Sequence, residues 1–239
     1  MNEIEQLREW IHDSDNIVFF GGAGVSTESN IPDFRSVDGL YNQEYDYPPE
    51  TILSHTFFMR NTPEFYRFYR NKMIFPDAEP NKAHLALAEL EKQGKLKAVI
   101  TQNIDGLHQK AGSTEVLELH GSVLRNYCMK CGKFYNLQDT ISQEGIPKCS
   151  CGGIIKPDVV LYEEGLSEAV LNGAVAAIQS ADVLIVLGTS LVVYPAAGLL
   201  RFFGGKHLVL INKDATPYDN IADLVINDSF SNVFPHLHV

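Results

Sequence analysis

The sequence predicts an α/β fold with a doubly wound, Rossmann-like parallel sheet and a smaller domain that contains a four-cysteine zinc ribbon. One observation behind this prediction is a set of short apolar runs that each stop at small or polar residues, as buried parallel strands do. Another is the helical patterns between these runs, which indicate βαβ units. The predicted strands are residues 17–20, 99–101, 116–119, 183–187, 207–211 and 224–226.

The predicted helices have recognisable starting signals. Asn2 forms a capping-box pattern with Glu5, which begins the first helix. Thr62-Pro63 begins another, because proline is favoured in a first helical turn. Further predicted helices cover residues 82–93, 167–180 and 194–203, whereas residues 38–60 show no clear period and are predicted to be irregular.

Charge and hydropathy exclude several classes of protein. The 239 residues carry a formal charge of −11, and a negative surface repels phosphate backbones, so nucleic acid is not an expected ligand. No run approaches the roughly 18–20 apolar residues of a membrane helix, so no membrane association is expected. The acidic start of the chain lacks the layout of a signal peptide, which favours a cytoplasmic location. The sequence does not determine the oligomeric state.

A glycine turn, Gly22-Ala23-Gly24, follows the first predicted strand. A strand, then glycines, then a helix start is an arrangement that binds phosphate groups. A third glycine three positions later is absent, so the dinucleotide fingerprint is incomplete and a simple tight turn is the alternative. Further on, Arg35 is suited to a diphosphate and Phe34 to covering a flat ring. A surface ion pair and a packed phenylalanine are the alternatives for these two.

Polar side chains follow two neighbouring predicted strands. Gln102, Asn103 and Asp105 come after one of them, and His120 comes after the next. Ligands of open α/β sheets bind beyond the carboxyl ends of the strands, so these side chains are predicted to share one crevice. A polar loop whose side chains cap turns is the alternative for any one of them.

The only four cysteines of the chain form two close pairs. Cys128 and Cys131 are followed, after 17 residues, by Cys149 and Cys151. This is the spacing of a four-cysteine zinc ribbon, whose closed site has a structural role. Disulfides are the alternative, and a cytosolic setting disfavours them. The second pair has one residue between its cysteines where two are usual.

Taken together, these motifs resemble one family. The chain resembles a sirtuin of the compact bacterial type, an NAD-dependent protein-lysine deacylase, over nearly its whole length. It departs from the family at Asn30, where glycine is usual, in the shortened second cysteine pair, and at Tyr162-Glu163, where Phe-Gly is usual. The matching segments are residues 22–26, 31–35, 101–108, 120–121, 156–160, 188–190 and 211–212, with the four cysteines.

The resemblance implies a role for each part of the chain. An NAD-binding Rossmann-like domain would comprise residues 1–32, 81–121 and 160–239, and a small domain residues 33–80 and 122–159. NAD would be the co-substrate, and a structural zinc would be bound by Cys128, Cys131, Cys149 and Cys151. The implied NAD-binding residues are Gly22, Ala23, Gly24, Thr27, Phe34, Arg35, Gln102, Asn103, Ile104, Asp105, His120, Gly188, Thr189, Ser190, Asn212 and Asp228.

The resemblance also implies the catalytic and substrate residues. His120 would act as general base on a ribose hydroxyl, Asn103 would position the ribose or a water, and Asp105 would hold the nicotinamide carboxamide. Val159 and Val160 would line the acyl-lysine tunnel while their backbone pairs with the substrate peptide as an added strand. Tyr162 would lie at the edge of the peptide cleft.

The implied reaction removes acetyl or other neutral acyl groups from lysines of proteins or peptides and yields nicotinamide and O-acyl-ADP-ribose. Transfer of ADP-ribose to an acceptor at the same site is the first alternative. A hydride-transferring dehydrogenase is the second, but it would need an acidic residue at a strand end about 20 positions beyond the glycines. A non-enzymatic zinc-ribbon module is the third, and it leaves the polar strand ends unexplained.

The acyl preference depends on the helix that begins at Thr62. Sirtuins that prefer succinyl or malonyl groups resemble one another in carrying Tyr-x-x-Arg on this helix. Here the residue three positions after Tyr66 is Tyr69, and Arg70 is four positions on, rotated by about 100°. Arg70 is therefore expected to point to solvent or to an acidic neighbour, and neutral acyl groups are expected to be preferred.

Overall fold

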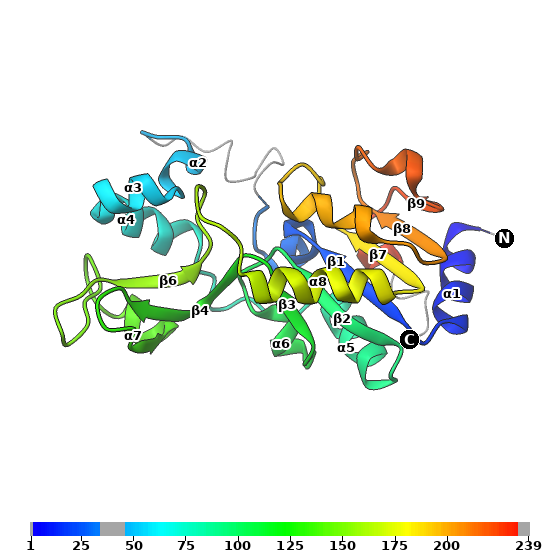
Figure 1. The fold of residues 1–239 in the computed structure, drawn as a ribbon, viewed down its shortest axis with the longest axis horizontal. Coiled ribbons are helices and arrows are strands. Elements are labelled where there is room, and N and C mark those ends of the chain that lie inside the picture. The colour runs from blue at the N-terminus through cyan, green and yellow to red at the C-terminus, as the bar shows by residue number, and fades with distance from the viewer. Residues whose placement is uncertain (1, 34–45, 234–239) are drawn as a thin grey trace.

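The structure, a computed structural model, describes residues 2–33 and 46–233. It has two parts, a six-stranded sheet covered by helices and a smaller part built on a three-stranded sheet (Figure 1). No helix among these described residues is long and apolar enough to cross a membrane.

The large sheet confirms the six predicted strands. All of its strand pairs are parallel, and the strand order is β3-β2-β1-β7-β8-β9. The order reverses direction beside β1, which is the switch point where open α/β sheets bind ligands. The strands are β1 (Ile17–Gly21), β2 (Leu96–Thr101), β3 (Val116–Glu118), β7 (Val183–Leu187), β8 (His207–Ile211) and β9 (Leu224–Ile226).

The six strands end at the same level. Gly21 at the end of β1 is the register partner of both Thr101 and Leu187, the last residues of its two neighbours. The residue that follows each strand therefore emerges at one edge of the sheet. The complete row of register partners is Glu118, Thr101, Gly21, Leu187, Ile211 and Ile226.

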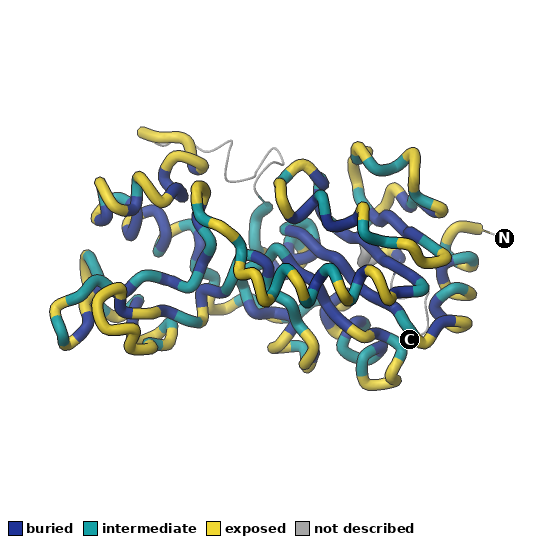
Figure 2. Tube along the Cα trace, in the orientation of Figure 1, coloured by how far each residue is buried: buried dark blue, intermediate teal, exposed yellow. Residues whose placement is uncertain are grey.

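Helices cover both faces of this sheet because side chains along each strand alternate between the faces. Phe19 packs on one side with α1 (Glu3–Asp13) and α5 (Lys82–Lys92). Phe20 packs on the other with α8 (Glu168–Ser180) and the 3₁₀ helix η3 (Ala196–Phe202). The strands are buried between the two layers (Figure 2). The prediction of a doubly wound sheet is confirmed.

The smaller part contains an antiparallel sheet of order β5-β4-β6. Its core includes the aromatic side chains of helix α4 (Thr62–Lys72) together with Val123, Val159 and Leu161. This core is separate from the two clusters of the large sheet, and we propose on that ground the two-domain division expected from the sequence. The elements are β4 (Gly121–Cys128), β5 (Phe134–Asn136), β6 (Ile155–Val159), α2 (Pro49–Ile52), α3 (His55–Arg60), α4 (Thr62–Lys72) and α7 (Leu137–Ile141).

Two predictions of local structure need correction. Residues 49–60 were expected to be irregular, but they form α2 and α3, and residues 38–45 lie outside the described residues. The reason is local capping, since the Ser54 hydroxyl accepts a hydrogen bond from the Phe57 N–H at 3.2 Å. The helix expected over 194–203 is a 3₁₀ helix. The remaining elements are η1 (Ala23–Ser29), α6 (Leu107–Ala111), η4 (Asp219–Ile221) and α9 (Phe230–Val233).

The other predicted helices are confirmed. Helix α1 begins with the capping box, in which Asn2 and Glu5 each accept a hydrogen bond from the other's backbone N–H. Helix α5 ends before Gly94, whose positive φ of 76° suits the left-handed position after a helix.

Candidate active site

A cavity of about 1170 Å³ lies along the row of strand ends. Every predicted catalytic, NAD-binding or substrate residue that the structure describes lines this cavity, whereas Phe34 and Arg35 lie outside the described residues. The lining residues predicted from the sequence are Gly22, Ala23, Gly24, Thr27, Gln102, Asn103, Ile104, Asp105, His120, Val159, Val160, Tyr162, Gly188, Thr189, Ser190, Asn212 and Asp228.

The glycine turn after β1 packs against the turn after β7. A Cβ on Gly24 would lie 2.7 Å from the Gly188 Cα, and a Cβ on Gly22 would lie 2.7 Å from the Thr189 Cβ. The Gly24 N–H also donates to the Gly188 carbonyl at 2.8 Å. These glycines are thus required by contact between two turns. Contact between two turns is a reason for glycine beyond the phosphate site and the tight turn expected from the sequence.

The 3₁₀ helix η1 (Ala23–Ser29) begins within the glycine turn and is followed by Asn30 as its C-cap. Asn30 has φ 62° and ψ 26°, and its N–H donates to the carbonyls of Ser26 and Thr27. Asparagine is among the few residues that occupy this left-handed region readily. The departure from glycine at this position is therefore compatible with the turn.

Asp105 is held in a small polar cluster. Its carboxylate accepts hydrogen bonds from the Ser26 hydroxyl at 2.7 Å and from the Leu107 N–H at 2.9 Å. The Asn103 amide donates to the same Ser26 hydroxyl at 3.0 Å. Burial raises the pKa of Asp105, and the hydrogen bonds from Leu107 and Ser26 oppose that rise. Ser26 lies in a matched motif, but sequence reasoning assigned it no role.

His120 is oriented by the neighbouring strand. Its Nδ1 lies 3.0 Å from the Gln102 carbonyl oxygen. A carbonyl only accepts, so Nδ1 carries the hydrogen and Nε2 keeps its lone pair. Burial lowers the pKa of His120 below 6.5, although the hydrogen bond to Gln102 raises it. The imidazole is therefore neutral at pH 7 and can accept a proton at Nε2.

Gly121 brings β6 next to His120. It has a φ of 75°, and a Cβ at this position would lie 1.9 Å from the Asp158 carbonyl oxygen. Only glycine permits both the conformation and this approach. As a result the Val160 N–H donates to the His120 carbonyl at 3.0 Å. The predicted acyl-lysine residues and the predicted general base are thus adjacent.

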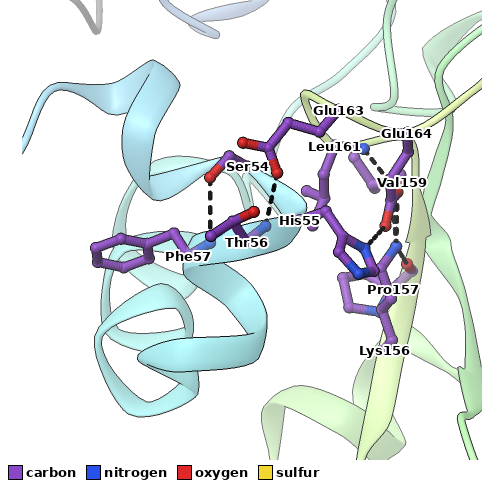
Figure 3. Close-up of polar contacts among 10 residues, drawn as sticks. All are labelled: Ser54, His55, Thr56, Phe57, Lys156, Pro157, Val159, Leu161, Glu163 and Glu164. Atoms are coloured by element: carbon purple, nitrogen blue, oxygen red, sulfur yellow. Dashed lines mark hydrogen bonds and ion pairs between the residues drawn. The ribbon is translucent and has the colours of Figure 1, made fainter.

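The turn after β6 forms one rim of the cavity and is fixed by Glu164 (Figure 3). The Glu164 carboxylate lies 2.9 Å from His55 Nδ1, 2.9 Å from the Leu161 N–H that donates to it, and 3.1 Å from Lys156 Nζ. Burial alone would raise the pKa of Glu164. The hydrogen bonds from His55 and Leu161, with the charge of Lys156, outweigh burial and lower it.

Glu163 fixes the same rim to α3. It has φ 74°, a conformation that side chains rarely adopt. Its carboxylate accepts a hydrogen bond from the Thr56 N–H at 2.9 Å, in the first turn of α3 (Figure 3). This contact favours the left-handed backbone conformation of Glu163, at a position where the resemblance leads us to expect glycine.

Backbone donors at this rim already have partners in the chain. The N–H of Val160 donates to His120, that of Leu161 to Glu164 and that of Tyr162 to the Leu53 carbonyl. A substrate peptide added as a strand would have to use other backbone groups or displace these contacts. Pairing with the backbone of Val159 and Val160 stays a prediction.

Arg70 of α4 contacts a backbone carbonyl and an aromatic ring. Its guanidinium donates to the Gln143 carbonyl at 2.7 Å and lies 5.3 Å from the centroid of the Tyr66 ring. Arg70 is half-buried, and among residues 2–33 and 46–233 no acidic side chain forms an ion pair with it, because the chain segment around Gln143 lies against this face of α4. The Tyr66 hydroxyl donates to the Ile155 carbonyl. Tyr66, Tyr69 and Arg70 are not among the residues that line the cavity.

The four cysteines form a separate cluster in the smaller part. Their sulfur atoms all lie within 4.8 Å of one another. The distance between the Cys128 and Cys151 sulfurs is 3.5 Å, and that between Cys131 and Cys149 is 3.6 Å. Zinc–sulfur bonds of about 2.3 Å in a tetrahedron require sulfur separations of about 3.8 Å. The four thiols are thus positioned to bind zinc, despite the shortened second pair.

Comparisons with known proteins agree with this geometry. Residues 22–195 match the model of the Sir2 family. A protein of Clostridium acetobutylicum named NAD-dependent protein deacetylase is 63% identical over 98% of this chain and 97% of its own length. A protein of Cutibacterium acnes with the same name is 57% identical over 94% of this chain and 93% of its own length.

Solved structures give the same result. A Sir2 variant solved with a deacetylated p53 peptide and 3'-O-acetyl ADP ribose has a TM-score of 0.91 and 40% identity, covering 99% of this chain and 97% of that one. A complex of Sir2 with a p53 peptide and NAD+ has a TM-score of 0.87 and 42% identity, with coverage of 99% and 97%.

We expect one zinc ion per chain, and replacement of a buried ligand by Cys128→Ser should remove it. A structural four-thiolate site contributes directly to folding. We expect a loss of at least about 3 kcal/mol, equivalent to a fall in Tm of about 6–12 °C. Elemental analysis and thermal unfolding measure the two effects, with Ser142→Ala, an exposed serine of the smaller part, as the control. Zinc-free protein from a chelator-free preparation would contradict the assignment.

Proposed function

The chain belongs to the Sir2 family, and we infer that it is an NAD-dependent protein deacetylase acting on acetyl-lysine in proteins or peptides. The observation that carries this inference is the row of strand ends, which gathers Asn103, Asp105 and His120 around one cavity. The names of the relatives and the peptide in the related complexes support the same reaction.

The cavity suits NAD in both position and chemistry. It lies beyond the carboxyl ends of parallel strands, where dinucleotides bind, and its volume exceeds the roughly 300–1,000 Å³ of common ligand pockets. The half-buried Asp105 carboxylate is suited to the nicotinamide carboxamide, and the Asn103 amide is suited to hydroxyl groups of the nicotinamide ribose. When bound, NAD would supply the ribose carbon that takes the acyl oxygen as nicotinamide leaves. A water molecule is consumed to release the lysine, so the products are lysine, nicotinamide and O-acyl-ADP-ribose.

We propose that different regions of the cavity bind different parts of NAD. We assign the diphosphate to the glycine turn after β1 and the turn after β7, and the adenosine ribose to the region of Asn212 and Asp228. Arg35 and Phe34 keep their predicted roles in this proposal. The proposed NAD-binding residues are those of the sequence analysis, with Ser26 added because its hydroxyl joins Asp105 to Asn103.

His120 is proposed as the general base. Its Nε2 takes a proton from a ribose hydroxyl, and its Nδ1–H stays bound to the Gln102 carbonyl, which keeps the ring oriented during the transfer. Asn103 positions the ribose or a water. Asp105 binds the nicotinamide carboxamide, and Ser26 holds both of these side chains in place.

The acyl-lysine is proposed to enter beside β6. Val159 and Val160 lie next to His120 and line the cavity, and Tyr162 lies at its rim. The neighbouring lining includes Leu53, Met73 and Val123, which suit a neutral acyl chain. Proteins or peptides with acylated lysines are the proposed partners, and a cytoplasmic location stays a prediction.

Incubation with an acetyl-lysine peptide, with and without NAD, tests the proposed function. Mass spectrometry should show loss of the acetyl group, release of nicotinamide and formation of O-acetyl-ADP-ribose only when both substrates are present. A parallel incubation with labelled NAD and an unacetylated acceptor tests the alternative reaction. Label on the acceptor without deacetylation of the peptide would favour ADP-ribose transfer instead.

His120→Ala should reduce kcat by about 10²–10⁴-fold, the usual contribution of a positioned general base. The fold and the zinc content should be unchanged, and His12→Ala on the exposed face of α1 is the matched control. Retention of more than about a tenth of the wild-type rate would exclude the assignment.

The pH profile checks the same residue. A base must be neutral, and burial places the pKa of His120 below 6.5. Activity should therefore fall as the pH drops through this lowered pKa, with an acidic midpoint below the ordinary histidine value of 6.5. An acidic midpoint above pH 6.5 would contradict the effect of burial.

Acetyl-lysine should be preferred over succinyl-lysine in the same peptide. A succinyl carboxylate in the apolar part of the cavity would be costly without a cation, and Arg70 is held away from it by Gln143. The measurement is kcat/KM for both peptides. A preference for succinyl would point to Lys72, the α4 lysine in the cavity lining, as a partner for the carboxylate.

A further inference from the structure

Strand β4 leaves its ladder with β6 just beyond the proposed general base. The register pairs Ser122 with Asp158 and then Asn126 with Pro157. Residues 123–125 therefore oppose no residue of β6 and form a bulge. Bulges are common beside active sites, where they redirect a side chain or interrupt pairing. Two of the bulge residues, Val123 and Leu124, line the cavity.

The first two residues of the bulge support the loop after β2. The Val123 N–H donates to the Ile104 carbonyl at 3.0 Å. The Leu124 side chain packs on Gly106, where an added Cβ would lie 2.6 Å from Leu124 Cδ1. The bulge thus contacts the segment that carries Asp105.

The third residue, Arg125, joins the two sheets. Its Nη1 lies 2.6 Å from a Glu118 carboxylate oxygen, and its Nε lies 2.8 Å from an Asp158 carboxylate oxygen. Glu118 is the last residue of β3, two positions before His120, and Asp158 precedes Val159 on β6. The Glu118 side chain is only 9% exposed, so its charge depends on this cation for compensation.

We propose that Arg125 is a positioning residue for deacetylation, holding the acyl-lysine strand β6 at a set position relative to His120. Arg125 contacts Glu118, at the end of β3 just before His120, and Asp158, just before Val159 on β6. One planar guanidinium therefore constrains both strands. This inference rests on the proposed function. Displacement of reacting groups by about 1 Å lowers rates by about 10²-fold, which sets the scale of the effect.

Arg125→Ala should therefore lower kcat about 10- to 100-fold while leaving the Kd of NAD and the zinc content unchanged. Arg125→Lys keeps the charge but lacks the planar, two-sided geometry of the guanidinium, and it should restore part of the rate. The matched control is Arg67→Ala, which removes an arginine ion pair with Glu64 on the surface of α4.

A double-mutant cycle separates bridging from two independent stabilising contacts. Glu118→Ala and Asp158→Ala each break one arm of the bridge, so the double variant should have a kcat no lower than the worse single variant. Multiplicative losses in the double variant would overturn the proposal. A folded Arg125→Ala protein with wild-type kcat would also overturn the proposal. If that variant does not fold, the double-mutant cycle of Glu118→Ala and Asp158→Ala still tests it. Inactive wild-type protein would instead refute the proposed function.

Discussion

The common level at which the parallel strands end is the constraint on which the site depends. Because Gly21, Thr101, Glu118 and Leu187 are register partners, the segments that follow them meet at one edge. A shift of one residue in any strand would turn its side chains to the opposite face, where they would no longer fit the helices packed there. Burial of both faces of the sheet therefore also specifies where the polar residues converge.

Burial at this edge of the sheet also shifts the pKa values of His120 and Asp105. His120 is neutral because desolvation disfavours its charged form, and the Gln102 carbonyl selects the hydrogen on Nδ1. Burial acts in the opposite direction on Asp105, where hydrogen bonds from Ser26 and Leu107 oppose the rise in pKa. One partly enclosed cavity thus holds a neutral base and a hydrogen-bonded carboxyl group.

The two parts of the molecule meet where the proposed chemistry occurs. Gly121 allows β4 to approach the backbone of Asp158, and Arg125 adds a bridge of opposite charges a few residues away. On the far side of the turn after β6, Glu163 and Glu164 bind the first turn of α3. Strand β6 and its turn are therefore held from both ends, and the cavity keeps its shape through many separate polar contacts.

Local patterns in the sequence determined much of this protein. Short apolar runs located the six strands, the capping pattern of Asn2 and Glu5 located the start of α1, and cysteine spacing identified the four-cysteine cluster. Tertiary structure alone decided contacts between distant segments, such as Ser26 with Asp105 and Gly24 with Gly188. It also decided the partner of Arg70 and the bridge through Arg125, since these depend on how separate elements pack, and periodicity carries no information about that packing.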